Sequence, residues 1–205
     1  MEQEETPVWL SQDVHNIVAR KRKKQGVWEY SLTMFTKGFR TNVEAGYPRW
    51  TSFIRCLRKE VARLPKTDYI VGITSGGYII AEILAHFRKE TAVKLTYSQY
   101  NSEDIGDFCW RRGCQLVSRL DLMKFETPKV QLNIPEDAIW DKTCLLVDDS
   151  SGSGGTMRTC AKYLRDLGAK RVITYLFTNS MPDRYASDFC YTHNHCMVLP
   201  WGFDV

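Results

Sequence analysis

The chain has 205 residues, which is enough for one domain with an embellishment. It is 43% hydrophobic and 12% aromatic, which argues against global disorder, and no stretch approaches the about 20 consecutive apolar residues that span a bilayer. The net charge of +4 permits an anionic ligand without requiring nucleic acid, and seven cysteines without a C-x-x-C pair do not form a secreted disulfide framework. We therefore expect a cytoplasmic protein with neither a membrane nor a nucleic acid as partner.

Residues 1–45 differ from the rest of the chain. Their hydrophobic periodicity is poor, and they carry a basic run, Arg20 to Lys24, whose simplest interpretation is a solvated helix face. We interpret this segment as an N-terminal extension that forms part of a hood or docks a partner. The remaining residues, 46–205, are expected to form the main domain.

From Trp50 onward the pattern becomes regular. Apolar residues at helical spacing predict a helix over 50–64, which a proline ends. A buried strand is predicted over 69–74, followed by a glycine turn at 75–77, a helix over 78–89 and a second strand over 92–97. A strand, a helix and a strand in this order are typical of parallel sheets.

Residues 98–140 lack a long clean period and mix glycine, proline and arginine. A connection of this length inside a compact domain is usually functional or carries a hairpin of its own, and we expect a mobile loop here. Regular structure returns with strands predicted over 144–148 and 171–177 and an amphipathic helix between them. The expected fold is therefore α/β, a parallel sheet flanked by helices.

The segment after the strand at 144–148 carries the clearest chemistry. The strand delivers Asp148 and Asp149 to its carboxyl end, where ligands of open α/β sheets bind. A turn rich in glycine and serine then opens a helix, and free amides at a helix N-terminus hold phosphate. The candidate phosphate-binding residues are Ser151, Gly152, Ser153, Gly154, Gly155 and Thr156. A flexible linker is the alternative, but regular elements adjoin the turn on both sides.

The segment from Leu145 to Thr156 resembles the motif of type I phosphoribosyltransferases that binds 5-phosphoribosyl-1-pyrophosphate (PRPP). That motif is an apolar strand, two acidic residues and a loop that ends in Gly-x-Thr. The resemblance implies that Asp148 and Asp149 hold the ribose hydroxyls and Mg²⁺, directly or through water, and that the loop holds the 5′-phosphate. It also implies a small hood formed by the N- and C-terminal segments.

Two further stretches are similar to the same family. Residues 73–81 resemble its pyrophosphate loop, which implies pyrophosphate binding at Ser75, Gly76 and Gly77. Residues 182–201 resemble the base-recognition segment of the 6-oxopurine enzymes, and the candidate base-binding residues are Asn179, Val198 and Trp201. Residues 98–140 stand where the family has its catalytic loop, so Arg111 and Arg112 are candidate catalytic residues together with the acidic pair.

The resemblance implies an enzyme that transfers the phosphoribosyl group of PRPP to a nucleobase, with Mg²⁺ as cofactor and a purine as the expected acceptor. A homodimer is compatible with it. Three positions depart from the purine enzymes: Gly152 stands in place of an Asp, Ser75 in place of a basic residue, and Asn179 near the place of a Lys. These departures keep a second hypothesis open, a non-catalytic regulatory protein that binds PRPP or a nucleotide.

Replacing Arg111 and Arg112 together with Ala separates the two hypotheses. In an enzyme, the two guanidinium groups would meet a charge that grows on pyrophosphate as it leaves. The turnover rate should then fall far more than the affinity for PRPP, as measured by steady-state kinetics beside calorimetry. Wild-type rates would show that both arginines are solvated surface, and an equal loss of rate and binding would make them plain ligand contacts.

Overall fold

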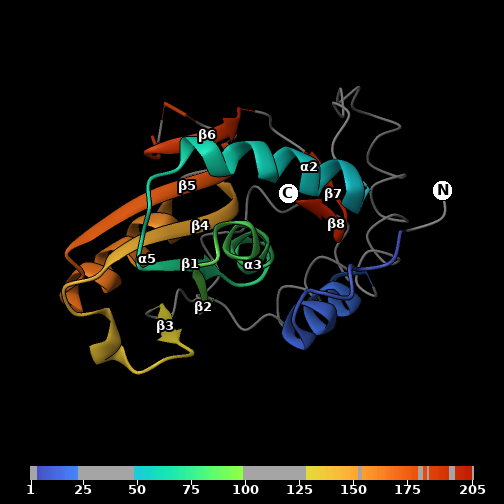
Figure 1. Ribbon diagram of the computed structural model, residues 1–205. Coiled ribbons are helices and arrows are strands. Elements are labelled where there is room, and N and C mark those ends of the chain that lie inside the picture. Colours follow the sequence, from blue (N-terminus) through green and yellow to red (C-terminus); the bar gives the residue numbers. More distant parts are fainter. Residues whose placement is uncertain are drawn as a thin grey trace, which may run out of the picture.

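The computed structural model describes residues 4–22, 49–98, 128–151, 154–179, 182–183, 185–193 and 197–204. A six-stranded sheet lies at its centre in the order β3-β2-β1-β4-β5-β6 (Figure 1). Every neighbouring pair is parallel except β2 with β3. The strands are β1 (Tyr69–Ile73), β2 (Thr91–Ser98), β3 (Lys129–Leu132), β4 (Thr143–Ser151), β5 (Arg171–Asn179) and β6 (Phe189–Thr192). The expected α/β fold with a largely parallel sheet is confirmed.

Helices connect and cover these strands. They are α2 (Trp50–Glu60) with the 3₁₀ turn η1 (Val61–Arg63), α3 (Gly76–Arg88), the 3₁₀ turn η4 (Glu136–Ile139) and α5 (Gly155–Asp166). Residues 12–22 form a further helix, which we call the N-terminal helix. None of the helices in the described segments combines the length and the apolar character that a membrane crossing requires.

The two faces of the sheet belong to two separate hydrophobic clusters because successive side chains of a strand point to opposite faces. On one face, Ile70 and Leu145 pack with the N-terminal helix, α2 and α3. On the other face, Val71 and Leu146 pack with α5. Since β1 and β4 are covered on both sides, their sequences are nearly continuous runs of apolar residues, as in other buried parallel strands.

Two segments differ from the sequence-based expectations. Residues 129–139, which we expected to lie within a mobile loop, form β3 and η4 at the edge of the sheet. Residues 4–22 belong to the extension for which the sequence shows poor periodicity, yet Leu10, Val14 and Val18 are buried in the core. Val14 and Val18 lie four residues apart on one face of the N-terminal helix, and Leu10 lies just before its start.

The C-terminal segment forms a short antiparallel hairpin, β7 (Met197–Leu199) with β8 (Gly202–Asp204). Trp201 lies between the two strands and is only 1% exposed. Its ring packs against Trp50 and Phe53 of α2, with centroids 5.8 and 5.1 Å apart. This aromatic cluster attaches the hairpin to α2, and the ribbon shows the two elements together (Figure 1).

Replacing Phe53 with Ala should lower the free energy of unfolding by about 3–5 kcal/mol. Phe53 is fully buried, and its ring also contacts Phe177 of β5, with centroids 5.0 Å apart, so truncation leaves a cavity between α2, the sheet and the hairpin. Urea unfolding followed by circular dichroism measures the change. Val8→Ala is the control, because Val8 is 92% exposed. Similar midpoints for both variants would contradict this account of the core.

Candidate functional site: two helix N-termini beside an acidic pair

The candidate site lies where the strand order of the sheet reverses. β1 and β4 are parallel neighbours, with Gly72 opposite Val147, although α3, β2 and β3 separate them in sequence. The chain leaves β1 into α3 on one face of the sheet and leaves β4 into α5 on the other. The carboxyl ends of two such strands form a crevice, which is the usual ligand site of open α/β sheets.

Glycines bring the start of α3 into contact with the end of β4. A Cβ atom at Gly76 would overlap the carboxylate of Asp149, and one at Gly77 would lie 2.8 Å from the Cα of Asp148. The first turn of α3 therefore approaches the acidic pair more closely than any residue with a side chain would allow. The predicted pyrophosphate-binding residues Gly76 and Gly77 and the predicted acidic pair are thus brought together in space.

The carboxylates of Asp148 and Asp149 are held in place by the backbone. Both residues are buried, with 8% and 7% of their surface exposed. Oδ1 of Asp148 accepts a hydrogen bond of 3.0 Å from the amide of Asp149, whose own Oδ1 accepts one of 3.0 Å from the amide of Ser150. Oδ2 of Asp149 faces the N-terminus of α3, where the helix dipole favours negative charge.

Lys21 of the N-terminal helix also reaches this carboxylate. Its Nζ lies 3.5 Å from Oδ2 of Asp149, and its side chain is 25% exposed. Sequence reasoning missed this residue, because it assigned the basic run that contains Lys21 to a solvated helix face. The only local signal was the four-residue spacing of apolar residues before it, which predicts a docked helix.

The candidate phosphate loop leads from β4 into α5. Gly154 immediately precedes the helix with φ +75°, a left-handed conformation that favours glycine, and a Cβ there would overlap the ring of Tyr185. The guanidinium of Arg158 lies over the ring of Tyr185, 5.2 Å from the ring centroid. Gly155 and Thr156 form the first turn of α5, while Gly152 and Ser153 lie outside the described residues.

The remaining predicted site residues are placed as follows. Asn179 ends β5 opposite Ser151 and is 1% exposed, and its Nδ2 donates a hydrogen bond of 2.7 Å to the carbonyl of Tyr185. Trp201 is buried in the aromatic cluster of the hairpin. Ser75 precedes α3 and is half-buried. Arg111, Arg112 and the side chain of Val198 lie outside the described part of the chain.

Two buried thiols, those of Cys160 on α5 and Cys144 on β4, lie on the elements that carry the candidate site. Burial, together with the negative charge of Asp148, raises the pKa of Cys160 well above the ordinary value for a thiol. Burial likewise raises the pKa of Cys144 to about 11. Both thiols are therefore protonated at neutral pH, and neither is suited to nucleophilic catalysis.

The donor set suits a hard divalent cation that binds together with its substrate. Within the described segments, no group of three or more His, Cys, Asp or Glu side chains forms a complete protein site for a metal. The two carboxylates of Asp148 and Asp149 offer oxygen ligands, and Mg²⁺ is usually bound through one or two carboxylates with substrate oxygens and water. The residues present therefore fit Mg²⁺ as a partner of a phosphorylated ligand.

Comparisons with known proteins identify the fold and the family. The model of the phosphoribosyl transferase domain matches residues 54–202. The purine phosphoribosyltransferase of Pyrococcus horikoshii Ot3 aligns with a TM-score of 0.58 and 21% identity, over 77% of this chain and 94% of that one. No match to a curated protein was found.

Two further solved structures share the fold at lower identity. A hypothetical protein from Neisseria gonorrhoeae with bound ppGpp aligns with a TM-score of 0.54 and 18% identity, over 80% of this chain and 91% of that one. A hypoxanthine-guanine phosphoribosyltransferase from Bacillus anthracis str. 'Ames Ancestor' aligns with a TM-score of 0.54 and 12% identity, over 80% and 92%. The family model covers the sheet, both helix N-termini and the acidic pair, and the resemblance of the sequence motifs to phosphoribosyltransferase enzymes is confirmed. The chain belongs to the phosphoribosyl transferase family.

Proposed function

We propose that this protein binds PRPP with Mg²⁺ at the crevice between β1 and β4 and transfers its phosphoribosyl group to a nitrogen of a nucleobase. The observation that carries the proposal is the convergence of the acidic pair, Asp148 and Asp149, with the N-termini of α3 and α5. Such a site offers carboxylates for ribose hydroxyls and free helical amides for phosphate groups. PRPP contains both kinds of group in one molecule.

Each part of the site has its own task in this reaction. The amides at the start of α3 would hold the pyrophosphate, those at the start of α5 the 5′-phosphate, and the two carboxylates the ribose between them. The bond from C1′ to pyrophosphate breaks as the base nitrogen attacks, so positive charge develops on the sugar and negative charge on the leaving group. Fixed dipoles and carboxylates stabilise these charges without reorganising at the moment of reaction.

Mg²⁺ bound beside Asp148 and Asp149 would supply positive charge to the pyrophosphate oxygens. The carboxylates are positioned for this before any ligand arrives, because backbone amides hold one oxygen of each.

A purine is the acceptor we propose. The support is the resemblance of residues 182–201 to the 6-oxopurine enzymes and the purine specificity named for two structures of the same fold. Two of the three residues proposed to recognise the base are engaged with protein groups: Asn179 donates a hydrogen bond to the carbonyl of Tyr185, and the ring of Trp201 packs against Phe53. Base recognition would therefore fall to groups around them, such as backbone amides and carbonyls near the end of β5.

A second candidate function is a non-catalytic protein that binds PRPP or a nucleotide. It is favoured by the hydrogen bond from Nδ2 of Asn179 to the carbonyl of Tyr185. This bond occupies a side-chain donor that was expected to recognise the base. The structure from Neisseria gonorrhoeae contains bound ppGpp in the same fold. Binding without turnover would distinguish this function from transfer.

The direct test is release of pyrophosphate from PRPP in the presence of Mg²⁺ and a panel of purine and pyrimidine bases. We expect release with at least one purine, and Asp149→Asn should raise the dissociation constant for PRPP about tenfold or more, since one charge-assisted contact is lost. Asp137→Asn, which removes the same charge from the exposed residue Asp137 of η4, is the control. PRPP binding without release by any base would favour the regulatory function, and equal binding by Asp149→Asn and wild type would refute the site.

A second test addresses the 5′-phosphate. Gly154→Ala should weaken binding of ribose 5-phosphate at least about tenfold, because a Cβ at φ +75° collides with Tyr185 and displaces the amides at the start of α5. Gly168→Ala is a matched control: Gly168 has φ +84°, and its Cβ would meet Trp140 instead. Both variants should lose stability, and only Gly154→Ala should lose the ligand in calorimetry. Equal affinities for the two variants would contradict phosphate binding at the start of α5.

A further inference from the structure

The N-terminal helix is an integral part of the domain next to the candidate site. Leu10, Val14, Ile17 and Val18 are each no more than 6% exposed and join the cluster that also contains α2 and α3. Residues in such a cluster hold their helix in a fixed position, since removing them from the core would expose apolar surface to water.

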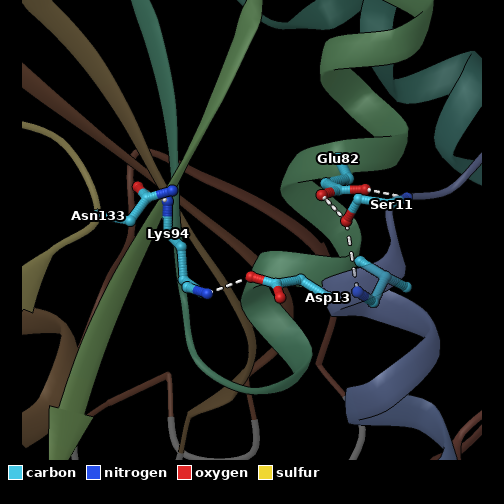
Figure 2. A network of polar contacts seen from close by, with 6 residues as sticks. Ser11, Asp13, Glu82, Lys94 and Asn133 are labelled. Carbon is cyan, nitrogen blue, oxygen red and sulfur yellow. Dashed lines mark hydrogen bonds and ion pairs between the residues drawn. The ribbon is translucent and has the colours of Figure 1, made fainter.

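Polar contacts fix the start of this helix (Figure 2). Ser11 caps it by accepting a hydrogen bond of 3.3 Å from the amide of Val14, and its own amide donates one of 3.0 Å to Glu82 of α3. The hydroxyl of Ser11 donates to the other oxygen of the same carboxylate. Asp13 forms an ion pair with Lys94 of β2. The helix is thereby attached to both elements that follow β1.

The end of the helix is also held. Nη2 of Arg22 donates hydrogen bonds of 2.8 Å to the carbonyl of Glu4 and 3.1 Å to the carbonyl of Pro200, which belongs to the turn between β7 and β8. Lys21 is the residue before Arg22, so its position is set by contacts on both sides of it. Its ammonium group lies 3.5 Å from Oδ2 of Asp149, the oxygen that faces the first turn of α3.

Lys21 adds a positively charged side chain to the proposed pyrophosphate site, beside the amides of α3 and the Mg²⁺ that would bind there. The two loops that would hold PRPP, residues 74–77 and 148–156, contain two aspartates and no lysine or arginine. A pyrophosphate group at the start of α3 would therefore meet two buried carboxylates, and like charges at close range repel. Lys21 brings a positive charge to this spot from a segment distant in sequence.

We propose that Lys21 is a binding residue for the pyrophosphate group of PRPP. The proposal rests on the proposed function and extends it to a residue outside the matched family domain, which begins at residue 54. The lysine ammonium has three donors on a flexible stem, so it can contact Asp149 and a phosphate oxygen together. Because negative charge grows on pyrophosphate as it leaves, the contact strengthens during transfer.

The experiment compares Lys21→Met with Arg20→Met. Methionine keeps the apolar stem and removes the charge, and Arg20 lies next to Lys21 on the exposed side of the same helix, where its Nε donates to the carbonyl of Asn16. Calorimetry with two probes, inorganic pyrophosphate and ribose 5-phosphate, each with Mg²⁺, reports on the two halves of the site separately.

We expect Lys21→Met to weaken pyrophosphate binding about tenfold or more and to leave ribose 5-phosphate binding within about twofold. Arg20→Met should change neither affinity, and Lys21→Arg should retain most of the pyrophosphate affinity because it keeps the charge. Melting temperatures of all variants show whether the helix stays docked.

Three results would overturn the proposal. Equal pyrophosphate affinity for Lys21→Met and Arg20→Met would make Lys21 a surface ion pair. Tighter binding by Lys21→Met would show that Lys21 competes with the ligand for Asp149. Equal weakening of both probes would indicate a merely structural role. If the wild-type protein binds ribose 5-phosphate but not pyrophosphate, this inference alone fails, whereas binding of neither probe also refutes the proposed function.

Discussion

The approach of α3 to the end of β4 is the contact on which the candidate site depends. Gly72 in β1 lies directly under the start of α3, where a Cβ would be 2.7 Å from the carbonyl oxygen of Gly77. Gly76 and Gly77 then leave room for the acidic residues of the neighbouring strand. Three glycines within six residues thus let a helix begin against two carboxylates. A side chain at any of them would push α3 away from β4 and separate the halves of the site.

This contact explains how two carboxylates remain buried side by side. Burying an ionised group is costly unless hydrogen bonds or opposite charges compensate. Here backbone amides, the N-terminus of α3 and the ammonium of Lys21 all face the pair. The N-terminus of α3 and the ammonium of Lys21, which stabilise the carboxylates in the absence of a ligand, are also suited to bind the phosphates of a ligand. The site is therefore organised before binding, which favours catalysis by electrostatic preorganisation.

The sequence predicted those parts of the structure whose signals are local. The strands around Val71 and Leu146 are unbroken apolar runs, and the acidic pair with its glycine loop matches a family motif, so the sheet and the family followed directly. Three features depend on contacts distant in sequence. β3 pairs with β2 across residues 99–127, Trp201 packs on α2, and Lys21 reaches Asp149. Such contacts leave no periodic trace in the sequence.

The central claim is that one ligand, with a pyrophosphate at one end and a 5′-phosphate at the other, spans the N-termini of α3 and α5. A crystal structure of the protein with PRPP and Mg²⁺ tests it most directly. The account predicts pyrophosphate at the amides of residues 76–77, the 5′-phosphate at the amides of residues 154–156, and the ribose hydroxyls against Asp148 and Asp149. A ligand bound elsewhere on the domain, with the acidic pair still in contact only with protein groups, would contradict it.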